Sequence, residues 1–413
     1  MSICDSLKNY KEYINDSFYQ NSVYLIISSL TNNASGFFFW VIAALLFSQT
    51  DIGLASAIIS VCGLCVLFSR FGIDQSLIRF FPEGNKSQIF TTTLIATLVF
   101  TLAFGLIYLL GIEVFTPDLA FIKNYALIFL LFLCANLFKQ ITSVCFIAIR
   151  ASKHFLIQNL IFCSRILFLI PFAFLNLGPV GIFSAIGIAF ILSSLYSLVY
   201  LYKFDIRYQQ FDLVFLRNSF KFSMSNYLIG ISMEAPKYLI PLIILFILGP
   251  DDVARYFIPF TFCSIFFAIS NATSTQLLVE GSHGESLKKG MRSAIITIFF
   301  FQTLAMIFIF FFGQFFLDLL GKGYSDGLNL MLIISVSNYF IGFFSIYYSV
   351  KNVQKNFRNL LVVCGIQFLL HISLCWILLV HFGLIGAAYS WLISYIITCG
   401  LICCMMYRDG FGK

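Results

Sequence analysis

Leu46-Phe47-Ser48-Gln49-Thr50-Asp51-Ile52 joins two long apolar runs, and Ile247-Leu248-Gly249-Pro250-Asp251-Asp252-Val253 repeats this pattern 201 residues later. Two further pairs of segments agree with this register. Residues 150–155 align with 352–357 at an offset of 202, and residues 177–181 align with 382–386 at an offset of 205. Each match alone is weak, but their common offset predicts an internal duplication.

The composition places both halves of the duplication in a lipid bilayer. The 413 residues are 60% hydrophobic and only 10% charged, whereas a soluble domain carries about 25% charged residues. The mean hydropathy is +0.95, and no polar stretch much exceeds twenty residues, which is too short for a folded domain outside the membrane. We therefore exclude a soluble globular protein.

Apolar runs of the roughly 20 residues that span hydrocarbon predict twelve helices, six in each half. In the first half they cover Ser22–Phe47, Gly53–Ile78, Ile89–Gly111, Ala120–Ile149, Phe155–Leu177 and Val180–Tyr202. In the second half they cover Leu216–Leu248, Asp252–Val279, Arg292–Leu317, Gly327–Val350, Asn359–Val380 and Leu384–Tyr407.

Basic residues predict the orientation of these helices. The tails and the connectors after even-numbered helices hold 18 of the 25 Lys and Arg residues, and the odd connectors hold only Lys123, Arg255 and Lys322. By the positive-inside rule we expect a multi-pass membrane protein with both termini in the cytoplasm.

The predicted fold class is therefore an all-α polytopic membrane protein with two parallel six-helix bundles. An even number of helices in each half relates the bundles by a pseudo-twofold axis along the membrane normal, and transporters built this way bind substrates between the repeats. The domain boundaries that follow are a cytoplasmic segment 1–21, a bundle 22–202, a linker 203–215, a bundle 216–407 and a tail 408–413.

Six charged side chains fall inside the predicted spans. Each costs about 2.5–3.5 kcal/mol in a lipid-facing helix, so together they would cost on the order of 15–20 kcal/mol and must face protein or water. They are Arg70, Asp74, Lys139, Arg165, Glu234 and Lys237.

Their spacing separates two kinds of charge. Arg70 and Asp74 are four residues apart, and Glu234 and Lys237 are three apart, so each pair can form an ion pair on one helix face. Either pair could be structural or could act in coupling or gating; Pro236, inside the second pair, favours a hinge.

Lys139 and Arg165 have no acidic neighbour on their own helices and lie about 15 Å from the cytoplasmic side. Interhelical hydrogen bonding could occupy them, but they are the best substrate-binding candidates, together with Arg70 and Lys237. Four buried cations against two acids predict a net-positive cleft for an anionic substrate. Polar faces on the first, second, seventh and eighth helices would line this cleft, although single Ser and Thr residues more often join helices.

The pattern resembles the multidrug/oligosaccharidyl-lipid/polysaccharide exporter superfamily, and within it the polysaccharide flippases that move O-antigen or capsule repeat units. The resemblance rests on twelve spans in two sets of six, on residues 51–57 and 70–82, and on Lys153 and residues 383–388.

The resemblance implies alternating-access transport of an undecaprenyl-pyrophosphate-linked oligosaccharide across the cytoplasmic (inner) membrane for surface polysaccharide biosynthesis. The implied partners are this anionic glycolipid, membrane lipid and other polysaccharide-assembly proteins, with no nucleic acid.

Two other functions remain open. A drug or cation antiporter of the same superfamily would need an uncompensated buried acid, whereas both acids here have basic neighbours. A polysaccharide polymerase or ligase would need a large extracytoplasmic loop, and the odd connectors are short. The sequence has no ATP-binding, nucleophile or metal-ligand motif, so we expect a non-enzymatic carrier without a cofactor.

Overall fold

The computed structural model describes residues 17–81, 84–282 and 286–408, and within these ranges the chain forms helices and no strand. Twelve segments of the described chain are long and apolar enough to cross a membrane. This confirms the twelve spans and the all-α fold class. The elements of the first half are α2 (Ser17–Leu46), α3 (Gln49–Ser69), α4 (Ile73–Phe80), α5 (Lys86–Phe115), the 3-10 helix η1 (Pro117–Tyr125), α6 (Ala126–Ala148), α7 (Ser152–Phe162), α8 (Arg165–Phe174) and α9 (Gly178–Lys203).

The second half repeats this order. Both the fourth and the tenth spans begin with a 3-10 helix, which is a further structural trace of the duplication. The elements of the second half are α10 (Leu213–Leu248), α11 (Pro250–Ser282), α12 (Leu287–Leu319), η2 (Lys322–Gly327), α13 (Leu328–Val353), α14 (Phe357–Phe382) and α15 (Leu384–Arg408).

Polar side chains just before several spans fix where the helices begin. The Ser48 side chain accepts a hydrogen bond from the Asp51 N–H, Asn85 accepts from Gln88, and Asp212 accepts from Phe215. Each of these caps satisfies an N–H group that has no partner within the first helical turn.

Two spans that the sequence predicts as continuous helices are interrupted in the structure. The second span breaks between α3 and α4, where Phe71 and Gly72 have φ values of 45° and 72°. A side chain on Gly72 would also lie 2.9 Å from Ser223 Cβ, so the close approach of α10 requires glycine there. The fifth span breaks between Phe162 and Arg165, which begins α8.

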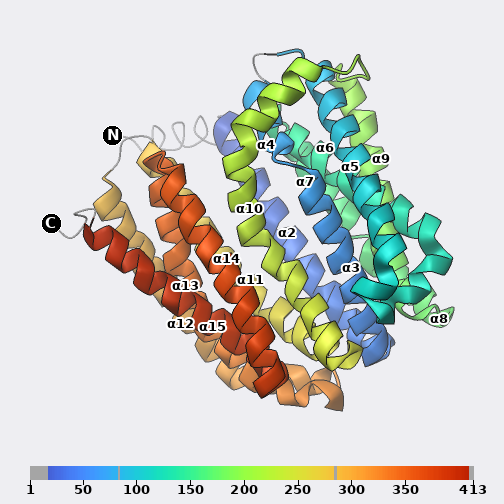
Figure 1. Ribbon diagram of the computed structural model, residues 1–413, viewed down its shortest axis with the longest axis vertical. Helices are drawn as coiled ribbons and strands as arrows, with labels where there is room; N and C mark the ends of the chain where they lie inside the picture. Colours follow the sequence, from blue (N-terminus) through green and yellow to red (C-terminus); the bar gives the residue numbers. More distant parts are fainter. Residues whose placement is uncertain (1–16, 82–83, 283–285, 409–413) are drawn as a thin grey trace, which may run out of the picture.

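The two halves form two lobes that meet along α2, α3, α10 and α11. Figure 1 shows α5, α6, α8 and α9 gathered on one side and α12 to α15 on the other.

Thr50 donates a 2.6 Å hydrogen bond to Asp251, and these two residues are equivalent positions of the repeat, 201 residues apart. Gly53 faces the backbone of Pro250 at the same crossing of α3 and α11, where a Cβ would lie 1.8 Å from the carbonyl oxygen. Equivalent residues can touch only near the axis that relates the lobes.

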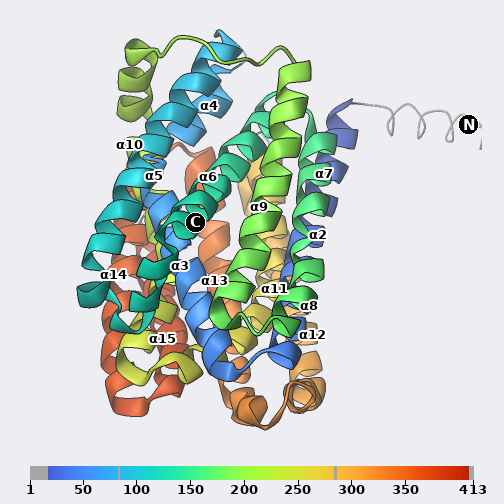
Figure 2. The same ribbon diagram turned by 90° about the vertical axis from the view of Figure 1, so that its right-hand side faces the viewer.

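The connector between the lobes is attached to the first lobe. Figure 2 shows residues 204–212 crossing one end of the molecule from α9 to α10. The N–H groups of Arg207, Gln209 and Asp212 each donate a 3.0 Å hydrogen bond to a hydroxyl group of α5. The three acceptors are Ser87, Thr91 and Thr92. The connector therefore positions the start of α10 against α5.

Candidate functional site

A cavity of about 360 Å³ lies between the lobes where α3, α4 and α6 face α10. Asp74 and Glu234 line it with Arg70, so one guanidinium group stands against two carboxylates. The prediction of a net-positive cleft is therefore wrong for this cavity, because Lys139, Arg165 and Lys237 are not among its lining residues. Its remaining lining residues are Leu67, Gly72, Gln75, Gln140, Asn226, Tyr227, Gly230, Ile231 and Tyr238.

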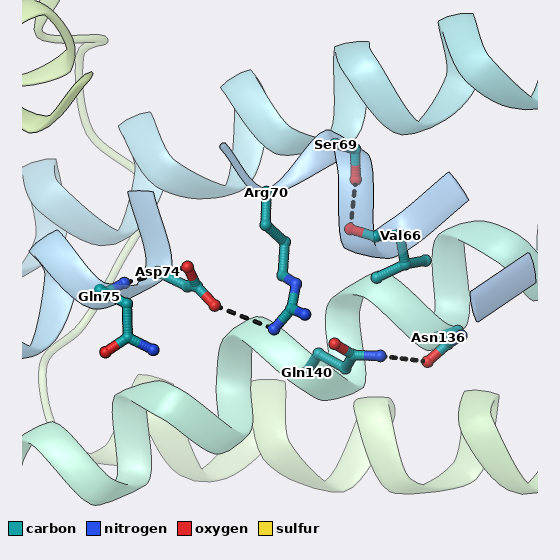
Figure 3. Close-up of polar contacts among 7 residues, drawn as sticks. All are labelled: Val66, Ser69, Arg70, Asp74, Gln75, Asn136 and Gln140. Atoms are coloured by element: carbon teal, nitrogen blue, oxygen red, sulfur yellow. Dashed lines mark hydrogen bonds and ion pairs between the residues drawn. The ribbon is translucent and has the colours of Figure 1, made fainter. Parts of the chain in front are cut away.

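Arg70 and Asp74 form an ion pair at the break between α3 and α4. Arg70 Nη1 lies 3.0 Å from Asp74 Oδ2, and the side chains are 24% and 7% exposed. The other Asp74 oxygen accepts the N–H of Gln75 at 3.1 Å. Figure 3 shows the guanidinium group between Asp74 and Gln140, which is itself bonded to Asn136. Both residues of the pair line the cavity, and the backbone at the start of α4 holds the Asp74 carboxylate in place.

Glu234 and Lys237 form the second predicted pair on α10. Lys237 Nζ lies 3.0 Å from Glu234 Oε1, and both side chains are a little under half exposed. Glu234 lines the cavity but Lys237 does not. Pro236 is buried inside the same helix, and α10 continues through both Pro236 and Pro241. A helical proline leaves one carbonyl without its usual N–H partner. Helix α10 therefore lacks a backbone hydrogen bond close to the Glu234–Lys237 ion pair.

Lys139 and Arg165 converge on one aromatic ring in the first lobe. Lys139 Nζ lies 4.5 Å from the centre of the Phe162 ring, and Arg165 Cζ lies 4.3 Å from the same centre. Helix α6 supplies the lysine, α7 ends at the phenylalanine, and α8 begins at the arginine. Arg165 therefore contacts the ring across the interruption of the fifth span.

Neutral groups surround these two cations. Arg165 Nη2 donates to Ser35 Oγ at 2.9 Å and to the Asn32 carbonyl at 3.4 Å, both on α2. Lys139 Nζ has no hydrogen bond or ion pair within the part of the chain that the structure describes, and neither cation is among its ion pairs. Cation–π contacts stabilise each charge by about 0.5–2 kcal/mol but do not neutralise it. The cluster, which we call the Phe162 site, therefore keeps two positive charges.

Burial differs between the two cations of the Phe162 site. Arg165 is only 9% exposed because α2 covers it, whereas Lys139 is half-buried. The expectation that Arg165 faces a cleft between the lobes therefore does not hold. The α2 polar face mostly joins helices within its own lobe, as Ser28 shows by accepting a 2.6 Å hydrogen bond from Asn159.

Sequence reasoning missed the aromatic residues of both sites. In the inter-lobe cavity these are Tyr227 and Tyr238. They lie on the same face of α10 as Ile231 and Glu234, at spacings of four, three and four residues, so helical periodicity around Glu234 would have found them. Phe162 gives no such signal because a single phenylalanine among 52 does not stand out.

Comparisons with known proteins agree with this architecture. A family model described as polysaccharide biosynthesis protein matches residues 18–276. None of the curated proteins matches the chain in sequence.

Three solved structures show the same fold at low identity. The lipid II flippase MurJ in an inward closed conformation has a TM-score of 0.77 at 16% identity, over 91% of this chain and 86% of that chain. An inward-facing multidrug resistance MATE family transporter of the MOP superfamily has a TM-score of 0.66 at 14% identity, over 92% and 96%. A MOP superfamily transporter from Pyrococcus furiosus has a TM-score of 0.64 at 14% identity, over 96% of each chain.

The two-lobed fold of twelve spans is thus shared with these MOP superfamily transporters and with the lipid II flippase, as the sequence resemblance implies. Since the family model covers more than half of the residues, this multi-pass membrane chain belongs to the polysaccharide biosynthesis protein family.

Proposed function

We propose that this protein is a flippase that moves an undecaprenyl-pyrophosphate-linked oligosaccharide across the cytoplasmic membrane for surface polysaccharide biosynthesis. Bundles 22–202 and 216–407 would open alternately to the two sides. The family assignment and the fold shared with a lipid II flippase support this proposal. A carrier is also what a fold with a cavity between two related lobes suits best.

The two cations of the Phe162 site carry the proposal. Two positive charges held together inside a membrane protein without a carboxylate are costly unless an anion joins them for part of the cycle. A diphosphate has the charge and the acceptor oxygens to accept from both Lys139 and Arg165. A low-dielectric wall strengthens this attraction over that in water.

The inter-lobe cavity suits the sugar part of the same substrate. Its amide, phenol and ion-paired groups both donate and accept hydrogen bonds, as sugar hydroxyls do. Gln140 lines the cavity and follows Lys139 directly, so the two sites share helix α6. The lipid tail would remain in the bilayer while the head group crosses.

The charges of the cavity disfavour a drug or cation antiporter. Asp74 and Glu234 are both bound to cations at 3.0 Å, so neither carboxylate is uncompensated. A cation substrate would have to displace Arg70 or Lys237 from its partner. The flippase proposal needs no such displacement.

Substitution of the two cations tests the proposal. We expect Lys139→Ala and Arg165→Ala each to lower the flipping rate about 10–100-fold, because a charge-assisted hydrogen bond contributes about 1.5–3 kcal/mol. Reconstituted vesicles would report the rate as the fraction of fluorescent lipid-linked oligosaccharide exposed to an added glycosidase. Arg207→Ala is the control, since Arg207 is exposed on the connector. Wild-type rates in both cation variants would remove these residues from the mechanism.

Cysteine labelling tests the orientation. The exposed Cys403 and Cys404 would first be replaced by serine, and single cysteines would then be introduced. We expect an impermeant thiol reagent added outside the cell to label cysteines at Gln49, Pro179 and Asp318. Cysteines at Ser152 and Ser286 should stay unlabelled. The reverse pattern would place both termini outside the cytoplasm.

A further inference from the structure

A groove of about 480 Å³ lies on the second lobe, outside the inter-lobe cavity and the Phe162 site. The first three turns of α12 and the last turn of α15 form it, and Figure 1 shows these helices on the same side of the molecule. Its lining residues are Lys288, Met291, Arg292, Ile295, Ile296 and Met406.

The charge of the groove is positive. Lys288 and Arg292 are four residues apart, so their side chains lie on one face of α12, and both are exposed. Neither takes part in an ion pair with another described residue, and no carboxylate lines the groove. Like charges at this spacing repel each other, and a bound anion would relieve the repulsion.

The order of residues along α12 matches a lipid and not a soluble anion. Ile295 and Ile296 lie one turn beyond Arg292, about 5–6 Å further along the helix. Phe299 and Phe300 follow and are 49% and 64% exposed. Cations at the membrane surface with an apolar strip below them present a head-group site followed by an acyl-chain site.

The equivalent place in the first lobe lacks this arrangement. Helix α5 begins at Lys86, 201 residues before Leu287 begins α12. At this offset Lys288 and Arg292 correspond to Ser87 and Thr91, whose hydroxyl groups accept hydrogen bonds from the connector. The duplicated scaffold therefore does not itself create a basic groove, which is a property of α12.

We propose that the α12 groove binds one anionic phospholipid. The phosphate would lie between Lys288 and Arg292, and one acyl chain would follow Ile295, Ile296 and Met406. This inference stands apart from the proposed function, because it concerns a site on the lipid-facing surface of one lobe.

Native mass spectrometry of the full-length protein tests the proposal. Protein in detergent would be titrated with dioleoylphosphatidylglycerol or with dioleoylphosphatidylcholine, and the retained lipid counted. We expect wild-type protein to retain one phosphatidylglycerol in preference to phosphatidylcholine. Lys288→Gln/Arg292→Gln should lower that preference about 30-fold, because each basic residue near a membrane surface contributes about 1 kcal/mol.

Three controls separate a lipid site from general charge effects. Lys86→Gln should leave the preference unchanged, and Lys288→Arg/Arg292→Lys should keep it. Ile295→Asn/Ile296→Asn should weaken retention if an acyl chain lies in the groove. Equal retention of both lipids by wild-type protein would overturn the proposal. Displacement of phosphatidylglycerol by millimolar inorganic phosphate would also overturn it, since the site would then bind a soluble anion.

Discussion

Arg70, Lys237 and Arg165 are stabilised by two kinds of local contact, a carboxylate on the same helix or neutral groups around the cation. Arg70 has a carboxylate one turn away, Lys237 has a carboxylate three residues away, and Arg165 has a hydroxyl group and two aromatic rings. A charge in the hydrocarbon region needs some such partner, because its loss of hydration otherwise costs several kcal/mol. Only a cation whose partners are neutral, such as Arg165, keeps a net positive charge that an anionic substrate could bind.

The Arg70–Asp74 pair can be tested for a structural against a transport role. Asp74→Asn should destabilise the protein by about 1–3 kcal/mol, because it leaves a guanidinium group without its partner; partial exposure of Arg70 lowers the full cost of a broken buried pair. The double variant Arg70→Gln/Asp74→Asn should recover most of this stability. Thermal unfolding in detergent measures the stability, and the vesicle assay measures flipping.

The double variant separates the two roles. A purely structural pair predicts that flipping recovers together with stability. A pair that contacts the substrate predicts a stable double variant that stays inactive. We expect the second outcome, because Arg70 and Asp74 both line the inter-lobe cavity.

At the scale of elements, each interrupted span carries functional side chains at its break. Arg70 and Asp74 lie at the break after α3, and Phe162 and Arg165 lie on either side of the break after α7. The members of each pair are only three or four residues apart, so each contact spans its break within about one helical turn. Both breaks occur in the first lobe, which holds the Phe162 site.

Gly72→Ala should destabilise the protein by about 2 kcal/mol or more. The residue has a φ of 72°, which costs about 1–2 kcal/mol for other residues, and the added Cβ would lie 2.9 Å from Ser223. Gly365→Ala is the matched control because Gly365 lies inside α14 with no atom within 4 Å of an added Cβ. Thermal unfolding should show a loss for the first variant and no loss for the second. Equal midpoints would show that the break tolerates a helical geometry.

At the scale of the whole molecule, the lobes share a scaffold but not a charge pattern. At the offset of 202 that applies in this region, Arg165 corresponds to Gln367 and Lys139 to Ile341. Gln367 donates to Ser394 at 3.2 Å in α15, so a neutral amide takes the place of the guanidinium group. The Phe162 site therefore has no counterpart among the described residues of the second lobe. We infer that the anionic part of a substrate would stay with the first lobe.

The contact between Thr50 and Asp251 offers a test of alternating access. Opening of the cavity toward this end of the molecule must separate the two residues, because they join the lobes near their pseudo-twofold axis. A Thr50→Cys/Asp251→Cys variant, treated with a short reducible bis-methanethiosulfonate, should lose flipping and regain it after reduction. Each single cysteine variant, treated in the same way, should stay active. Unchanged flipping by the cross-linked protein would show that the lobes need not part there.

The sequence by itself determined the twelve spans, the duplication and the two short-range ion pairs. The transfer of each apolar run from water to hydrocarbon is favourable by itself, so each span enters the bilayer without help from the rest of the fold. Helical geometry then places residues three or four apart next to each other. Only the tertiary structure decided that Lys139 and Arg165 share Phe162, that the inter-lobe cavity holds two carboxylates against one guanidinium group, and that two spans break. Those features depend on distances between separate helices and on the close approach of α2 and α10 to their neighbours. Packing sets such distances across the whole molecule, and the spacing of residues along one helix does not contain them.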